Sequence, residues 1–325
     1  MKWKHPVLTG NERIVFMGTP EFAVATLDAL VSAGFPVCAV VTAPDRPAGR
    51  GRQLRASAVK QRALELGIDL LQPEKLKDPV FVEQLKAYNA SIHVVVAFRM
   101  LPEVIWNMPP LGTINLHASL LPKYRGAAPI NWAVANGEEV TGATTFRIQQ
   151  EIDTGDVLLQ EKIDIGKDDT AGDVHDRLMV MGAALMVRTI HGLFDGTLHA
   201  TPQQNDKSDL PAAPKLNNEN TRLHFDRSAQ QVHDLVRGMS PFPGAWCEWM
   251  TDGNRPLHCK VLRTRIADMD EKKAPGTVLL NGTRMFVACD DGFIEVMELQ
   301  LEGRKRMESA DLFRGLRVEG TISLQ

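Results

Sequence analysis

The chain has 325 residues, of which 44% are hydrophobic and 24% are charged, so it has the composition of packed domains and is not a disordered chain. A formal net charge of -3 excludes a protein that is basic over its whole surface, although a local basic patch stays possible. No apolar run approaches the roughly 20 residues that cross a bilayer, and the first ten residues lack the apolar core of a signal peptide.

Short apolar segments recur through the first 200 residues. We expect buried strands at 13–18, 36–42, 68–71 and 92–97. Helices are predicted between them, the first with Thr19 as its N-cap and Pro20 at its first position. Another helix is expected at 56–66 and a long one at 170–194. This alternation predicts an α/β fold with a doubly wound, mainly parallel sheet over residues 1–200.

The pattern changes after this region. Residues 201–214, TPQQNDKSDLPAAP, are polar and rich in proline, and they predict a linker. Ser228 is a candidate N-cap for a short amphipathic helix. Strand patterns then dominate, and Asn281-Gly282 is a strong hairpin signal. Residues 215–325 therefore predict a smaller second domain, a β-barrel.

Asn115 and His117 lie in a strand-like segment that begins the stretch INLHASLLPKYRG. If the alternation is that of a strand, both side chains point to one face, at the end where open α/β sheets build their sites. A second segment, EIDTGDVL, places Asp153 just after the strand-like GATTFRI. Both segments also have an explanation without a functional role. A single histidine is often a polar residue whose hydrogen bonds are satisfied inside the protein, and Asp-Thr-Gly-Asp is often only a turn.

Together these three side chains form a usable set for acyl chemistry. An amide donates to a developing oxyanion, an imidazole carries a proton near neutral pH, and a carboxylate orients that imidazole or relays a proton. The sequence has no GxSxG elbow and no activated cysteine, which favours direct attack by an external amine. Nucleotide-binding fingerprints of the GxGxxG and GxxxxGK[ST] kinds are absent.

Positive charge is concentrated in residues 45–62, which hold six basic residues against one acidic residue. Such a segment is either a solvated loop or a phosphate-binding surface. The four cysteines, at positions 38, 247, 259 and 289, are scattered and form no CxxC pair. They predict a reduced, cytoplasmic protein without a metal site.

Several long motifs match a known family. The segment NLHASLLPKYRGAAPINWAVANGE, followed by TGATTFRIQQEIDTGD, resembles the formyl-tetrahydrofolate-dependent transferases. The segments IVFMGTPEFAV, TAPDRPAGRGR, APKLNNENTRLHFDRS and SPFPGAW extend the resemblance over roughly 300 residues. The basic PDRPAGRG segment and the C-terminal region resemble the branch whose acceptor is methionine esterified to initiator tRNA.

The resemblance implies a fold, substrates and residue roles. The fold is a Rossmann-like domain followed by an OB-like barrel. The donor is 10-formyltetrahydrofolate, the acceptor is initiator methionyl-tRNA, and neither a metal, a membrane nor a second subunit is expected. Asn115, His117 and Asp153 match the catalytic trio. The implied folate-binding residues are Ser119, Leu120, Leu121, Pro122, Phe98 and Arg99. The expected tRNA contacts are Arg46, Arg50, Arg52 and Arg55, with Lys260, Arg263 and Arg265 as candidates on the barrel.

One departure concerns Phe98 and Arg99, which stand where many members have Tyr-Gly. Three alternatives stay open at this point. The acceptor is a small amine, such as a glycinamide ribonucleotide or an amino-sugar nucleotide, or water replaces the amine in a hydrolase. A non-catalytic RNA-binding protein is the third alternative, but it gives the trio no reason to converge.

Overall fold

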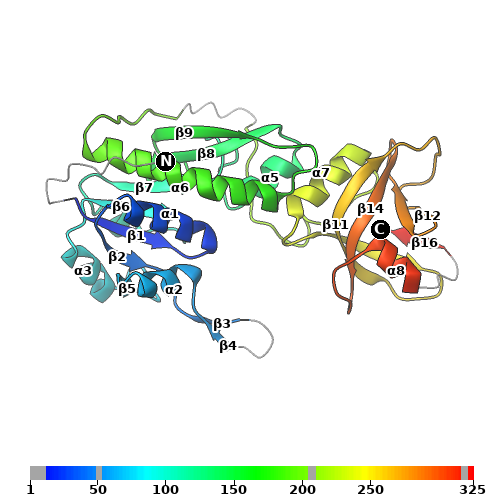
Figure 1. The fold of residues 1–325 in the computed structure, drawn as a ribbon, viewed down its shortest axis with the longest axis horizontal. Helices are drawn as coiled ribbons and strands as arrows, with labels where there is room; N and C mark the ends of the chain where they lie inside the picture. The colour runs from blue at the N-terminus through cyan, green and yellow to red at the C-terminus, as the bar shows by residue number, and fades with distance from the viewer. Residues whose placement is uncertain (1–11, 49–52, 204–209, 316–320) are drawn as a thin grey trace. The chain divides into compact units, whose positions relative to one another are not determined.

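The computed structural model describes residues 12–48, 53–203, 210–315 and 321–325 (Figure 1). These residues form two compact units. The first is built within 12–126, 142–163 and 175–211, and the second within 127–141, 164–174 and 212–325. The predicted domain bounds, 1–200 and 215–325 with a linker between them, stay a prediction.

A seven-stranded sheet forms the centre of the first unit. Its strands are β1 (Ile14–Gly18), β2 (Val37–Val41), β5 (Asp69–Leu71), β6 (Ile92–Val96), β7 (Thr113–His117), β8 (Val140–Arg147) and β9 (Val157–Asp164). Their order is β5-β2-β1-β6-β7-β8-β9, with β5 to β7 parallel and β8 antiparallel to β7. The predicted Rossmann-like, mainly parallel sheet is confirmed.

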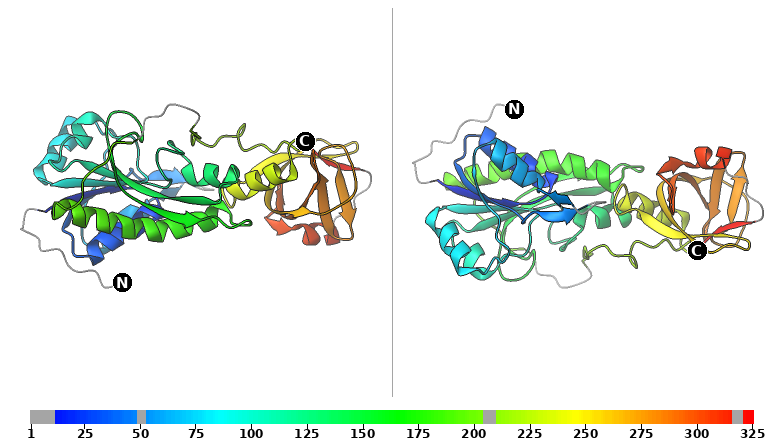
Figure 2. Two further views of the ribbon diagram at one scale, coloured as in Figure 1. Left: turned by 90° about the horizontal axis from the view of Figure 1, so that it is seen from above. Right: turned by 90° about the horizontal axis from the view of Figure 1, so that it is seen from below.

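Helices cover both faces of this sheet (Figure 2). They are α1 (Glu21–Ser32), α2 (Ala58–Glu65), α3 (Pro79–Ala87), α4 (Glu103–Trp106) and α6 (Ala171–Phe194). Phe22 of α1 packs on His175 of α6 with ring centroids 5.1 Å apart, so these helices share one face. On the other face, Phe81 and Leu85 of α3 pack against Val15 and Val95 of the sheet.

The predicted cap of the first helix was wrong by one residue. Pro20 is extended (φ -82°, ψ 176°) and is the N-cap of α1, so Thr19 lies before the helix and its side chain caps nothing. Ser57, by contrast, caps α2 by accepting a hydrogen bond from the Lys60 amide. The hairpin of β3 (Arg46–Ala48) and β4 (Gln53–Arg55) was not predicted.

Within the described residues, α6 alone has the length and composition of a membrane-spanning helix. Half of its most apolar stretch is buried inside the protein, and core helices pass the same test. Its partners are those of a core helix, since Phe194 packs against Phe35 with ring centroids 5.9 Å apart.

The second unit is built on an antiparallel sheet. Its strands are β10 (Ala245–Thr251), β11 (Leu257–Ala267), β12 (Val278–Asn281), β13 (Arg284–Ala288), β14 (Phe293–Leu301), β15 (Met307–Glu308) and β16 (Ile322–Leu324). The order is β12-β13-β14-β11-β10-β16, and β15 pairs with β14. The Leu324 amide donates to the Gly276 carbonyl at 2.8 Å, which draws the two edges together. The predicted hairpin at Asn281-Gly282 and the near-barrel are confirmed.

Gly276 allows this closure because it has no side chain. Its φ is +83°, and a Cβ there would lie 2.2 Å from the Leu324 carbonyl oxygen. Three helices complete the unit: α5 (Pro129–Ala135), α7 (Ala229–Met239) and α8 (Ser309–Gly315). Ser228 caps α7 with a full capping box, as its sequence predicts.

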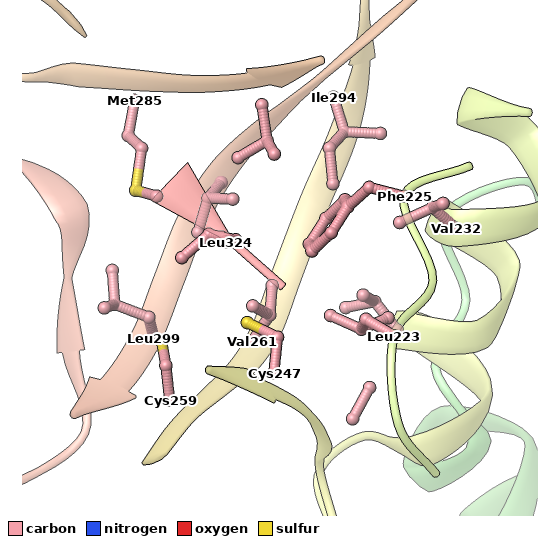
Figure 3. Close-up of a cluster of buried hydrophobic side chains, with 14 of the residues drawn as sticks. Leu223, Phe225, Val232, Cys247, Cys259, Val261, Met285, Ile294, Leu299 and Leu324 are labelled. Atoms are coloured by element: carbon pink, nitrogen blue, oxygen red, sulfur yellow. The ribbon is translucent and has the colours of Figure 1, made fainter. Parts of the chain in front are cut away.

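The core of the second unit lies between α7 and the sheet (Figure 3). Val232 and Val236 of α7 join Cys247, Val261 and Ile294 of the strands, and each is 1% exposed or less. The strands therefore alternate between this core and an outward face, which carries the polar side chains.

Candidate active site

Asn115 and His117 lie at the carboxyl end of β7, the last of the parallel strands. They are two residues apart on a strand, so their side chains share one face. Asn115 is paired in register with Val95 on β6 and Phe146 on β8, both buried. Within the described part of the chain, its half-buried amide has no hydrogen-bond partner, which leaves the amide free to bind a ligand.

His117 is only 6% exposed and is held between two oxygen atoms. Its Nε2 lies 2.9 Å from the Tyr124 carbonyl oxygen, and its Nδ1 lies 3.7 Å from Oδ2 of Asp153. A carbonyl oxygen only accepts, so Nε2 carries a hydrogen when this bond is made. The neutral ring would then turn a lone pair toward the carboxylate, whereas the protonated ring has an N–H for each oxygen.

Asp153 has a left-handed backbone, with φ at +54°, which a short polar side chain tolerates better than most. Its Oδ2 accepts a hydrogen bond from the Gly126 amide at 3.0 Å. The next glycine in the loop, Gly155, is packed so closely that a Cβ would lie 1.7 Å from the Arg147 carbonyl oxygen. The DTG motif is therefore a tightly seated loop that fixes its carboxylate beside His117.

Gln203 anchors the same loop from a segment distant in sequence. Its Nε2 donates to the carbonyl oxygens of Asp153, at 3.0 Å, and Gly155, at 2.7 Å. Its Oε1 accepts from Nη2 of Arg125 at 2.6 Å. Sequence reasoning missed Gln203, because it stands in the polar segment predicted as a linker and belongs to no motif.

The loop after His117 carries the implied folate-binding residues, and two of their side chains point into the protein. Ser119 is fully buried and its hydroxyl donates to the Lys123 carbonyl at 2.7 Å. Leu121 is 5% exposed, and its amide donates to Oγ1 of Thr144 at 3.1 Å. Leu120 and Pro122 are half-buried. The Leu121 carbonyl accepts from Nε2 of Gln160 at 2.8 Å, and the Ser119 carbonyl accepts from Oγ1 of Thr144 at 2.7 Å. These backbone groups are engaged inside the protein, which leaves Leu120 and Pro122 as the side chains of the loop for a ligand.

Phe98 and Arg99 follow β6, the strand beside Asn115. The Arg99 guanidinium lies over the Phe98 ring at 5.6 Å and donates to the carbonyls of Pro73 and Glu74. Its buried Nε has no partner within the described residues. Burial, followed by the charge of Arg46, lowers the pKa of this guanidinium. A half-buried cation with an unused, buried donor atom favours an anionic ligand.

The basic segment is only partly neutralised. Lys60 pairs with Asp45 at 2.6 Å, and Arg62 pairs with Asp28 at 2.6 Å. Arg46 and Arg55 stand opposite each other in the β3–β4 hairpin and are both exposed. Arg50 and Arg52 lie outside the described residues. The positive charge of this region is thus carried by the hairpin and not by α2.

The candidates on the second unit are all engaged. The Lys260 ammonium donates to the Pro243 carbonyl at 2.7 Å, Arg263 lies 3.5 Å from Glu308, and Arg265 lies 2.6 Å from Glu295. Arg263 and Glu308 are both exposed, so this surface ion pair is easily exchanged for a phosphate, whereas Arg265 pairs with the buried Glu295. Their role in binding stays a prediction.

No cluster of three or more His, Cys, Asp or Glu side chains suited to a metal occurs in the described part of the chain. The four cysteines are free thiols, three of them buried. Burial raises the pKa of the Cys289 thiol to about 12, which makes it a poor nucleophile.

Comparison with known proteins identifies relatives of this chain. A family described as formyl transferase matches residues 12–190, and a formyl transferase C-terminal domain matches 215–317. Methionyl-tRNA formyltransferase of Bacteroides fragilis is 46% identical over 96% of this chain and 98% of its own. The enzyme of the same name from Bacteroides thetaiotaomicron is 47% identical over 94% and 96%.

Solved structures give the same fold at lower identity. A sugar 3N-formyl transferase, WlaRD, solved in the presence of dTDP and 5-N-formyl-THF, is 18% identical, with a TM-score of 0.65 over 91% of this chain and 99% of its own. HypX of Aquifex aeolicus in complex with tetrahydrofolic acid is 16% identical, with a TM-score of 0.62 over 96% of this chain and 51% of its own. At these identities the likeness shows the fold alone.

Proposed function

The chain belongs to the formyl transferase family, and we propose that it transfers the formyl group of 10-formyltetrahydrofolate to the α-amino group of methionine on initiator tRNA. This step prepares the first aminoacyl-tRNA of translation. The acceptor is favoured by relatives of the same name at 46–47% identity over nearly the whole chain. The observation that carries the chemistry is His117, held 3.7 Å from Asp153 on the strand face that also bears Asn115.

Each substrate has residues suited to it. For the folate, we propose the loop that holds Ser119 and Leu121, with the side chains of Leu120 and Pro122 against the ligand, and the Phe98–Arg99 pair. The Asn115 amide, without a partner in the described residues, and the buried Nε of Arg99 are the unused donors that fit its formyl oxygen and a carboxylate. For the tRNA, we propose Arg46 and Arg55 of the β3–β4 pair, because they are exposed and can bind phosphates, together with the predicted Arg50 and Arg52, which lie outside the described residues.

The reaction is acyl transfer by direct attack. The neutral amine of methionine attacks the formyl carbon, so a carbon–nitrogen bond forms while the bond from that carbon to N10 of the folate breaks. The transition state places negative charge on the formyl oxygen. Asn115 donates to that oxygen, and protonated His117 stabilises its charge. The proton that the amine loses passes by way of Asp153 to N10 of the leaving folate.

Asp153 and the Tyr124 carbonyl have a defined part in this scheme. Both lie against the imidazole ring, and each offers its nitrogen atoms only an acceptor. Gly126 and Gln203 hold the carboxylate and its loop in place. The site is therefore built before either substrate arrives, which lowers the entropic cost of aligning two large molecules.

One assay separates this function from its alternatives. The purified protein is given 10-formyltetrahydrofolate with methionyl initiator tRNA, then with glycinamide ribonucleotide or an amino-sugar nucleotide, and then alone. We expect formyl transfer to the tRNA only. Transfer to a small amine, or release of formate without an acceptor, would contradict the proposed acceptor. Absence of all three would contradict the enzyme assignment.

We also propose where the protein acts and in which oligomeric state. Three buried free thiols suit a reducing compartment, so we propose that the protein is cytoplasmic. The prediction that it is a monomer is checked by the mass of the purified protein in light scattering.

A further inference from the structure

Strands β10 and β11 of the second unit present one outward face with aromatic and basic side chains. On β10, Ala245, Cys247 and Trp249 are buried, so Trp246 and Glu248 between them point outward. On β11, His258 and Lys260 flank the buried Cys259 in the same way. The register pairs Trp246 with Lys260 and Glu248 with His258, so these four side chains share one face.

Trp246 and His258 form a fixed stack on this face. Their rings are 5.0 Å apart and nearly parallel, at 14°. The indole N–H donates to the Asn218 carbonyl at 2.7 Å, and the Arg222 guanidinium lies over the indole at 5.0 Å. His258 is exposed, so the stack reaches solvent.

Phe242 lies at the end of this face, in the loop that enters β10. It is 80% exposed, the largest exposure among the large hydrophobic side chains of the described residues. The loop around it is held on both sides. Ser240 donates through its hydroxyl to the Leu262 carbonyl at 2.6 Å, and the Gly244 amide donates to Met239 at 2.8 Å. Because the loop is anchored, the phenyl ring stays exposed to water, and an apolar side chain fixed in this way indicates a surface that a partner covers.

Positive charge stands beside both aromatic groups. The Lys260 ammonium donates to the carbonyl of Pro243, next to Phe242, and this neutral partner leaves its charge uncompensated. The Arg222 charge, in contrast, is paired with Glu248 at 2.9 Å. Aromatic rings interleaved with cations bind single-stranded nucleic acid, because bases stack on the rings and phosphates meet the charges.

We propose that Phe242, Lys260 and His258 form a stacking surface for unpaired bases of the tRNA. The proposal rests on the proposed function, since it names a contact of the same acceptor. A stacking contact differs from a general attraction of tRNA to basic side chains, because the Phe242 side chain carries no charge. It also assigns Lys260 a definite neighbour, whereas Arg263 and Arg265 stand elsewhere on the sheet in ion pairs.

The test measures binding of fluorescently labelled initiator tRNA by anisotropy, which does not require formyl transfer. We expect Phe242→Ala to weaken binding about 5- to 150-fold, the range for loss of one stacked base. Phe242→Trp should restore most of the affinity, and Phe242→Leu should not. Leu280→Ala is the matched control, because Leu280 is an exposed apolar side chain of the same unit, at 42%. The KM for formyl-folate should stay unchanged in every variant.

Three results would overturn the proposal: wild-type affinity in Phe242→Ala, equal rescue by leucine and tryptophan, or an equal loss in Leu280→Ala. If the wild-type protein binds anionic vesicles of phosphatidylglycerol, and Phe242→Ala loses this binding but keeps its affinity for tRNA, Phe242 contacts a membrane instead. Failure of the proposed function is a separate result, because it is measured as absence of formyl transfer by the wild-type protein, whatever its affinity for tRNA.

Discussion

Replacing Asp153 by asparagine removes one charge from the site, and with it the carboxylate that relays the proton, while the shape of the side chain is kept. Asparagine keeps the size of the side chain, tolerates a φ of +54°, and retains an oxygen that can accept from the Gly126 amide. The charge lies 3.7 Å from Nδ1 of His117, and the two side chains are 13% and 7% exposed. At that distance its attraction for an imidazolium is about 4 kcal/mol at an effective dielectric constant of 20, and about 1 kcal/mol in water.

Because both side chains are nearly buried, the larger figure applies more closely. A tenfold change in rate corresponds to about 1.4 kcal/mol, so we expect kcat to fall about 10²- to 10³-fold in Asp153→Asn. The assay is single-turnover formyl transfer to methionyl initiator tRNA, with the KM of each substrate measured separately. Glu151→Gln removes a charge from an exposed position of the same loop and should leave kcat unchanged. A folded Asp153→Asn protein with near-normal kcat would refute the reasoning.

Four other outcomes follow from the same structure. Asn115→Ala should lower turnover about 10²- to 10³-fold, the usual cost of one oxyanion donor, with the KM for folate measured in the same titration. His117→Ala should lose at least about 10²-fold and also one limb of the pH–rate profile; a limb that persists would assign the titration to another group. Replacing Arg55 by glutamine should raise the KM for tRNA, flatten its salt dependence by about one unit of slope, and spare the KM for folate. Burial lowers the pKa of His93 to about 4. Below about pH 6.5, His93 is therefore protonated in the unfolded chain but stays neutral in the folded chain until the pH approaches 4. The free energy of unfolding should therefore fall by about 3 kcal/mol between pH 7 and pH 4 through this group, and urea titrations of His93→Leu should lack that decline.

The first sheet could be predicted from sequence because its strands are buried on both faces. Residues 14–18 and 92–96 read as nearly continuous apolar runs, and two of the helices between them, α1 and α2, are followed by Gly34 and Gly67. The hairpin of β3 and β4 could not be predicted in this way. Its strands are only three residues long and contain proline and arginine, so they are too short to leave an alternating pattern.

The proposed catalytic side chains were predicted from strand alternation and loop chemistry, but the residues that hold them in place were not. Asn115 and His117 are two residues apart on one strand, so their shared face follows from sequence alone. The contact between His117 and Asp153 joins residues 36 positions apart, and Gln203 is 50 positions beyond Asp153. Tyr124 acts through its carbonyl oxygen, which no side-chain pattern reveals.

The central claim is that Asn115, His117 and Asp153 surround the formyl group during transfer. The most direct measurement is a crystal structure of the protein with 5-formyltetrahydrofolate bound. We expect the formyl oxygen about 3 Å from the Asn115 amide nitrogen, and the formyl carbon beside the His117 ring. A bound folate whose formyl group lies against other residues, with the Asn115 amide still exposed to water, would contradict the account.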